Sequence, residues 1–118
     1  MSQILVIDDD ETVRDVVRQL LERDDHEVTE CEEGETGLES HAANPADLVV
    51  VDIQMPGISG FEVIRRLRQV DQEVKIIGVA GHTEALLQEA IEVGADRIMG
   101  KPLRLHPFLD MVNKLLDL

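Results

Sequence analysis

Short aliphatic runs alternate with longer amphipathic segments along the whole chain. Two of the runs, residues 4–7 and 48–51, each hold four aliphatic side chains without a polar interruption. Such runs are typical of strands that are buried on both faces of a parallel sheet. Residues 11–21 instead follow the period of one helical face and predict an amphipathic helix. The apolar positions of that helix are Val13, Val16, Val17, Leu20 and Leu21.

Turn and cap residues divide the rest of the chain into elements of the same two kinds. Asp9 or Asp10 can cap the first helix, Thr83 is suited to cap a later one, and Gly94 ends it. Pro107 favours the first turn of a last helix. The predicted strands are residues 4–7, 27–31, 47–52, 74–80 and 96–100. The predicted helices are residues 11–21, 34–43, 60–69 and 83–93, and a last helix that starts near Pro107.

This alternation predicts an α/β fold made of one domain. Short connections between alternating strands and helices imply parallel strands, right-handed crossovers and helices on both faces of the sheet. For five such units the common doubly wound strand order is 2-1-3-4-5, and ligands bind where the order reverses, at the carboxyl ends of the strands. We therefore expect the site beyond the ends of strands 4–7 and 47–52.

Acidic residues follow both of these strands. Asp8 and Asp9 come after the first strand, and Asp52 ends the third. Clustered carboxylates repel one another unless a cation joins them, and a hard cation such as Mg²⁺ prefers oxygen ligands. Lys101 follows the fifth strand and can hold a phosphoryl oxygen. An aspartate beside Mg²⁺ and a lysine can act as a nucleophile and form an aspartyl-phosphate.

Composition excludes several other classes of function. The formal charge of −14, with two Phe and no Tyr or Trp, disfavours direct binding of nucleic acid. No apolar run is long enough for a membrane span, and the N-terminus lacks a secretion signal, so we expect a soluble, cytoplasmic protein. The lone Cys31 is interpreted as a small core residue. The histidines lack metal-ligand spacing and receive no chemical role: His26, His41, His82 and His106.

The chain resembles the receiver domains of response regulators in two-component signalling. The resemblance lies in three segments and their spacing: ILVIDDD (residues 4–10), DLVVVDIQMPGISGFEVI (residues 47–64) and GADRIMGKP (residues 94–102). It covers essentially the whole sequence and implies a flavodoxin-like fold. We therefore expect a stand-alone receiver over residues 1–118, with no output domain. Such a domain is not an enzyme in the usual sense, because it promotes only its own phosphotransfer and dephosphorylation.

The resemblance also implies a role for each candidate site residue. Asp52 would be the phosphoacceptor, and Asp9 and Asp52 would ligate Mg²⁺ or Mn²⁺ together with the backbone carbonyl of Gln54. Asp8 would act on the metal through water, and Lys101 would pair with a phosphoryl oxygen. Members of the family usually have a cis peptide bond at the Lys-Pro step, so we expect one after Lys101.

Partners follow from the same resemblance. The phosphoryl group would come from a histidine kinase or a histidine phosphotransfer protein that docks on the first helix. A downstream protein would bind the face formed by the fourth helix, the fifth strand and the fifth helix. We expect a monomer or a weak dimer, without contact to nucleic acid or a membrane.

Four positions bear on switching and on the lifetime of the phosphate. The family's Ser or Thr at the end of the fourth strand falls on Val79, or on Ala80 if the register slips by one, and neither carries a hydroxyl. The family's aromatic switch residue falls on Ile98. The acid pair, Asp52, Mg²⁺ and Lys101 suffice for the chemistry, so phosphorylation is still expected. The missing hydroxyl and aromatic side chains bring its coupling to the output face into question. The resemblance also implies that Gln54 and Gly81 fall on the two positions that flank the attacking water in the family, where they would tune the phosphate's lifetime.

Two other functions fit parts of the sequence. The chain could be a pseudo-receiver that binds partners without being phosphorylated, an interpretation favoured by Val79 and Ile98. Residues 8–12 also fit the Asp-x-Asp-x-Thr motif of haloacid-dehalogenase-type phosphatases, in which Asp8 would be the nucleophile and Asp10 the general acid. The short length and the lack of a cap insertion or a late acidic pair count against the phosphatase.

Overall fold

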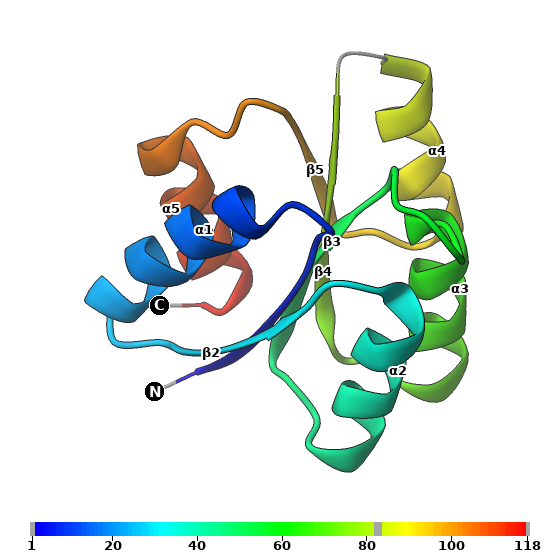
Figure 1. The fold of residues 1–118 in the computed structure, drawn as a ribbon, viewed down its shortest axis with the longest axis horizontal. Helices are drawn as coiled ribbons and strands as arrows, with labels where there is room; N and C mark the ends of the chain where they lie inside the picture. Colours follow the sequence, from blue (N-terminus) through cyan, green and yellow to red (C-terminus); the bar gives the residue numbers. More distant parts are fainter. Residues whose placement is uncertain (1, 82–83, 118) are drawn as a thin grey trace.

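Five parallel strands form the sheet of the described residues, 2–81 and 84–117, in the computed structural model (Figure 1). Their order is β2-β1-β3-β4-β5, which confirms the doubly wound topology predicted from the alternation of strands and helices. The strands are β1 (Gln3–Ile7), β2 (Glu27–Cys31), β3 (Leu48–Asp52), β4 (Lys75–Ala80) and β5 (Arg97–Gly100). The central position of β3 explains why its aliphatic run has no polar interruption.

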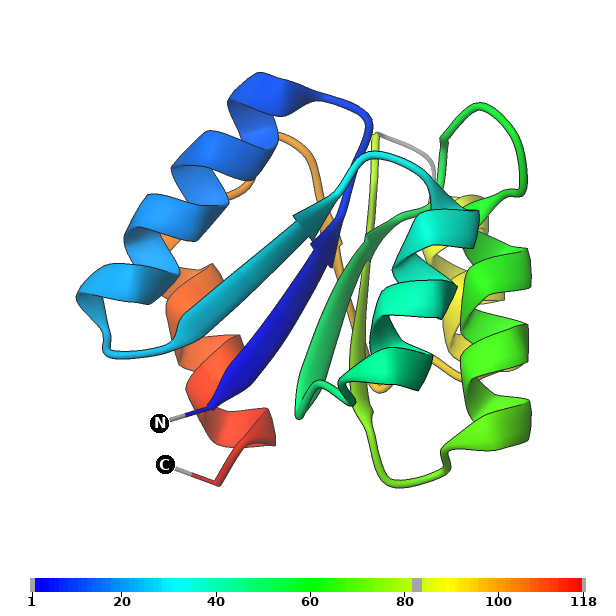
Figure 2. The same cartoon turned by 60° about the horizontal axis from the view of Figure 1, so that its bottom comes forward.

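Helices cover both faces of this sheet (Figures 1 and 2). The first and the last helix lie on one face, and the three helices between them lie on the other. The helices are α1 (Glu11–Arg23), α2 (Gly34–Ala43), α3 (Gly60–Val70), α4 (Glu84–Val93) and α5 (Leu105–Leu115). Within the described part of the chain, no helix combines the length and the apolar character needed to cross a membrane.

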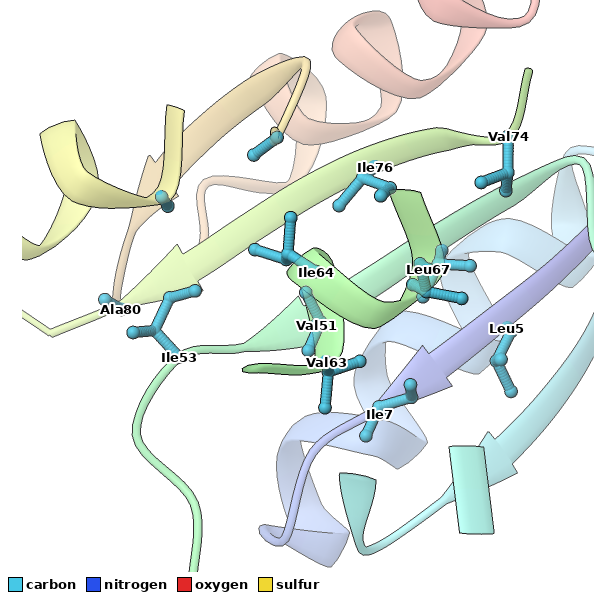
Figure 3. Close-up of a cluster of buried hydrophobic side chains, with 13 residues drawn as sticks. Leu5, Ile7, Val51, Ile53, Val63, Ile64, Leu67, Val74, Ile76 and Ala80 are labelled. Carbon is cyan, nitrogen blue, oxygen red and sulfur yellow. The ribbon is translucent and has the colours of Figure 1, made fainter. Parts of the chain in front are cut away.

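Alternate side chains of the central strands enter two separate cores. Ile4 and Val6 of β1 pack under α1 and α5, in what we call the α1–α5 core. Leu5 and Ile7 point the other way, into the α2–α4 core between the sheet and the remaining helices (Figure 3). β3 repeats this alternation, since successive side chains of a strand point to opposite faces. Both faces are thus apolar, and the polar residues of these strands are confined to their ends.

The caps of the helices follow local chemistry. Asp10 is confirmed as the cap of α1, because its carboxylate accepts hydrogen bonds from the backbone N–H groups of the next turn. Gly94 follows α4 with a φ of 129°, a conformation that favours glycine. The prediction that a last helix starts near Pro107 is confirmed: α5 begins two residues earlier, at Leu105, and Pro107 lies within its first turn. Thr83 lies outside the described residues.

Fewer of the predicted apolar positions of α1 are buried than expected. Val17 and Leu21 of α1 are buried, but Val16 is 45% exposed at the rim of the stripe. In α3, Val63, Ile64 and Leu67 are buried. A helix packed on a flat sheet buries only the side chains that face it, so positions at the edge of the stripe remain in contact with solvent.

We predict that Gly60→Ala destabilises the protein. A Cβ at position 60 would lie 2.5 Å from the Cα of Ile53 and closer still to the carbonyl oxygen of Asp52. Relief of this clash requires movement of the backbone that carries Asp52, so urea unfolding should show a loss of about 2 kcal/mol. Gly100→Ala is the matched control, because its nearest neighbour would be 3.9 Å away. Equal stabilities of the two variants would contradict the prediction.

Candidate functional site

The carboxyl ends of β1 and β3 bring three aspartates together. Asp8 and Asp9 directly follow β1, and Asp52 is the last residue of β3. One carboxylate oxygen from each lies within 4.8 Å of the other two. Asp8 and Asp52 are each only 4% exposed, whereas Asp9 is open to solvent. Two of the three negative charges are therefore largely removed from water.

Backbone and side-chain donors hold this acidic cluster in place. Oδ1 of Asp8 accepts a hydrogen bond from the N–H of Asp10 (2.9 Å), and Oδ1 of Asp52 accepts one from the N–H of Gln54 (3.1 Å). From α1, Nη1 of Arg14 donates to the carbonyl oxygen of Asp8 (2.6 Å). The sequence analysis missed Arg14, because its position on the polar side of the helical period gave no reason to separate it from a surface arginine.

Lys101 connects the two buried carboxylates. Its Nζ lies 3.1 Å from Oδ2 of Asp8 and 3.2 Å from Oδ2 of Asp52. The backbone N–H of Lys101 donates to the carbonyl oxygen of Ala80 at the end of β4 (2.7 Å). The expected cis peptide bond between Lys101 and Pro102 is confirmed. One lysine thus joins the ends of β1, β3, β4 and β5.

The charges of the site perturb one another. Burial, followed by the charge of Asp8, raises the pKa of Asp52 to about 6, although Gln54 and Lys101 act in the opposite direction. Burial lowers the pKa of Lys101, but the hydrogen bonds and charges of Asp8 and Asp52 outweigh it, so the net shift is upward. Lys101 therefore stays an ammonium ion at neutral pH, while burial beside another acid destabilises the ionised form of Asp52.

The donor atoms of the site suit a hard divalent cation. Three carboxylates converge there against a single ammonium group. Oxygen-only ligands at a partly solvated site are the preferred surroundings of Mg²⁺ or Mn²⁺, which take one or two carboxylates and keep several waters. Asp9 is exposed and the pKa of Asp52 is raised, so a bound cation could reach the first carboxylate and stabilise the ionised form of the second.

The end of β4 offers no side-chain hydroxyl to this site. Val79 is paired in register with Asp52, but its side chain is 2% exposed and belongs to the α1–α5 core. Ala80 is fully buried in the α2–α4 core. Ile98 of β5 packs against that same core. The amide of Gln54 does reach this strand end, since its Oε1 accepts a hydrogen bond from the N–H of Gly81 (3.3 Å).

Two histidines of the described residues, His26 and His41, have roles in the fold, while His82 lies outside those residues. His41 is buried, and its Nδ1 accepts from the N–H of Ala46 (3.0 Å) while Nε2 contacts Asp71 (2.9 Å). His26 is also buried and contacts Asn113 of α5 (3.1 Å). These partners could not be predicted, because Asp71 and Asn113 are distant from the two histidines along the chain.

An apolar hollow of about 370 Å³ opens beside Lys101. One wall is formed by α1, including the exposed Val16. The other wall is the connection between β5 and α5. The lining residues are Thr12, Val13, Val16, Val17, Lys101, Pro102, Leu103 and Leu105. Apolar surface of this kind next to a charged site is typical of protein–protein contacts.

Comparisons with known proteins agree with this geometry. The sequence pattern of the response regulator receiver domain matches residues 4–113. The chain is 36% identical to the transcriptional regulatory protein AfsQ1 of Streptomyces coelicolor over 88% of its own length. It is 26% identical to the sporulation initiation phosphotransferase F of Bacillus subtilis over 99% of its length. The chain spans 46% of the length of AfsQ1 and 95% of the length of the phosphotransferase.

A solved structure shows the same architecture. The response regulator receiver domain protein from Clostridium thermocellum superposes with a TM-score of 0.92 at 28% identity, covering 99% of this chain and 95% of that one. Strand order, the match over residues 4–113 and these similarities point to one family. The chain belongs to the response regulator receiver domains, the signalling domains of two-component systems.

Proposed function

We propose that this receiver accepts a phosphoryl group on Asp52 from a phosphohistidine of a kinase or a phosphotransfer protein. The observation that carries the proposal is the position of Lys101 Nζ, which lies 3.2 Å from Asp52 and 3.1 Å from Asp8. An ammonium ion beside a buried carboxylate can neutralise the incoming phosphoryl oxygens. Among the three acids, Asp52 combines burial, contact with Lys101 and a place at the centre of the sheet.

In the proposed transfer, Asp52 supplies the nucleophile. A carboxylate oxygen of Asp52 forms a bond to phosphorus, the P–N bond of the phosphohistidine breaks, and its electron pair returns to the imidazole nitrogen. Lys101 stabilises the charge on the transferred group. Asp9, Asp52 and the backbone carbonyl of Gln54 would hold Mg²⁺ or Mn²⁺ directly, and Asp8 through water. When bound, the metal supplies further charge neutralisation at the phosphoryl oxygens.

The surfaces around the site support the proposed partners. The hollow next to Lys101 lies beside α1, the helix expected to contact the phosphodonor, and exposes the apolar side chains of Val16 and Leu105. At the edge of the sheet, Ile98 of β5 and Leu87 of α4 line a groove between these two elements. We propose the surface formed by α4, β5 and α5 as the docking site of a downstream protein.

The phosphatase alternative conflicts with the contacts of its two key residues. Its general acid would be Asp10, but the carboxylate of Asp10 caps α1. Its nucleophile would be Asp8, which is paired with Lys101 and bonded to the N–H of Asp10. The pseudo-receiver alternative draws support from the apolar side chains at positions 79 and 98 and is decided by the modification experiment.

We expect acetyl phosphate and Mg²⁺ to add one phosphoryl group to the protein. Intact-mass spectrometry should detect this adduct in the wild type and none in Asp52→Asn, because the variant lacks the nucleophile. Asp110→Asn, which removes an exposed carboxylate from α5, is the matched control and should be modified like the wild type. A folded wild-type protein that binds Mg²⁺ but acquires no adduct would favour the pseudo-receiver.

We expect Mg²⁺ to stabilise the fold. At a concentration about ten times its dissociation constant, a ligand that binds only the folded state contributes about 1.4 kcal/mol. For a domain of this size that corresponds to a rise in melting temperature of roughly 4–8 °C. The rise should be strongly reduced in Asp9→Asn. Melting temperatures that are insensitive to Mg²⁺ would contradict the metal site.

We also expect a specific pH dependence in the absence of metal. The pKa of Asp52 is about 6 in the folded state, against about 3.9 for an unfolded aspartate, so the folded state binds more protons between these values. Stability should therefore fall as the pH rises from 4 to 7. Asp52→Asn should lack this loss and exceed the wild type at pH 7 by on the order of 2 kcal/mol. Urea unfolding in a chelator measures the difference.

The control for this experiment is again Asp110→Asn, which removes the same formal charge from an exposed position. It should follow the wild-type pH profile. A wild-type stability that rises between pH 4 and pH 7 relative to Asp52→Asn would overturn the interpretation, since it would require a lowered pKa at Asp52.

A further inference from the structure

The peptide unit between Ala80 and Gly81 is held on both of its polar sides. Its carbonyl oxygen accepts a hydrogen bond from the backbone N–H of Lys101 (2.7 Å). Its N–H donates to Oε1 of Gln54 (3.3 Å). This peptide unit marks the end of β4, where Ala80 pairs with Gly100 of β5 and packs into the α2–α4 core (Figure 3).

Both residues that hold this peptide unit also contact Asp52. The backbone N–H of Gln54 donates to Oδ1 of Asp52 (3.1 Å), and Nζ of Lys101 lies 3.2 Å from Oδ2. The contacts close a ring that runs from Asp52 through Gln54 to the peptide unit and back through Lys101. A change at the carboxylate of Asp52 therefore reaches the end of β4 by two routes.

The side chains of β4 itself provide no such route. The side chains of Val79 and Ala80 are buried in opposite cores and carry no hydrogen-bonding group. Gly81 supplies only its backbone, and a Cβ there would lie 3.4 Å from Oε1 of Gln54.

We infer that Gln54 is a positioning residue that transmits the state of Asp52 to the end of β4, in place of a hydroxyl on that strand. The inference rests on the proposed phosphorylation of Asp52. Modification of that carboxylate draws Lys101 toward the phosphoryl oxygens and changes the acceptor of the Gln54 N–H. With both anchors displaced together, the Ala80–Gly81 peptide unit shifts relative to the site. Without the Gln54 amide, the N–H of Gly81 loses its link to the site.

Hydrogen exchange of the full chain tests this inference, with Mg²⁺ and beryllofluoride as the probe of the modified state. Fluorine NMR measures occupancy, and variants are compared at equal occupancy because the Gln54 carbonyl is also a proposed metal ligand. In the wild type, loading should alter the exchange of amides in α4 and β5. In Gln54→Met, which keeps the side-chain length but lacks the amide, that response should fall about fivefold, as expected for one lost hydrogen bond.

Two further variants separate transmission from a general structural effect. Gln54→Glu retains an oxygen that can accept from Gly81 and should keep the response. Gln69→Met makes the same chemical change at an exposed position of α3 and should behave like the wild type. In the unloaded protein, the Gly81 amide should exchange about fivefold faster in Gln54→Met alone.

Three results would overturn the inference. One is a response in Gln54→Met that equals the wild-type response at matched occupancy. Another is a Gly81 amide whose exchange is unchanged by the substitution. The third is a loaded wild type in which α4 and β5 do not respond. A wild type that fails to take up beryllofluoride at all refutes the proposed phosphorylation, and the occupancy measurement separates that failure from the others.

Discussion

Two carboxylates that are almost excluded from water share one ammonium group at the centre of this domain. Asp8 and Asp52 repel each other, and burial removes the water that would screen them, so the pKa of Asp52 rises to about 6. Lys101 offsets part of this cost from the end of another strand. An excess of negative charge remains. A divalent cation that binds there, or a group transferred to Asp52, would change the electrostatic energy of this carboxylate.

The fold makes this unfavourable arrangement possible. Parallel strands place their carboxyl ends on one edge of the sheet, and the order β2-β1-β3-β4-β5 puts the ends of β1 and β3 side by side. The two apolar cores on either side of β3 supply the free energy that keeps the acids together. Gly60 packs directly against the backbone of Asp52 and Ile53, so the position of the acid also depends on a close contact between a helix and the loop before it.

The end of β4 turns its last side chains, Val79 and Ala80, into the two cores and away from the site. With Val79 committed to a core, backbone groups become the hydrogen-bonding partners of that strand end. Gln54 then has two roles in one residue, with its N–H on Asp52 and its amide on Gly81. In the mechanism proposed here, phosphorylation depends on the charges around Asp52, whereas transmission depends on the orientation of the Ala80–Gly81 peptide unit.

The amino-acid sequence was enough to predict the alternation of strands and helices, the sheet order and the gathering of Asp8, Asp9, Asp52 and Lys101 at strand ends. These follow from local periodicity and from the few ways in which parallel strands can be connected. The structure was needed to choose Asp10 over Asp9 as the cap of α1 and to place Arg14 on the Asp8 carbonyl. It likewise decided the buried partners of His26 and His41 and the contact between Gln54 and Gly81. Such contacts depend on rotamers and on neighbours far away in the chain, which hydrophobic periodicity does not encode.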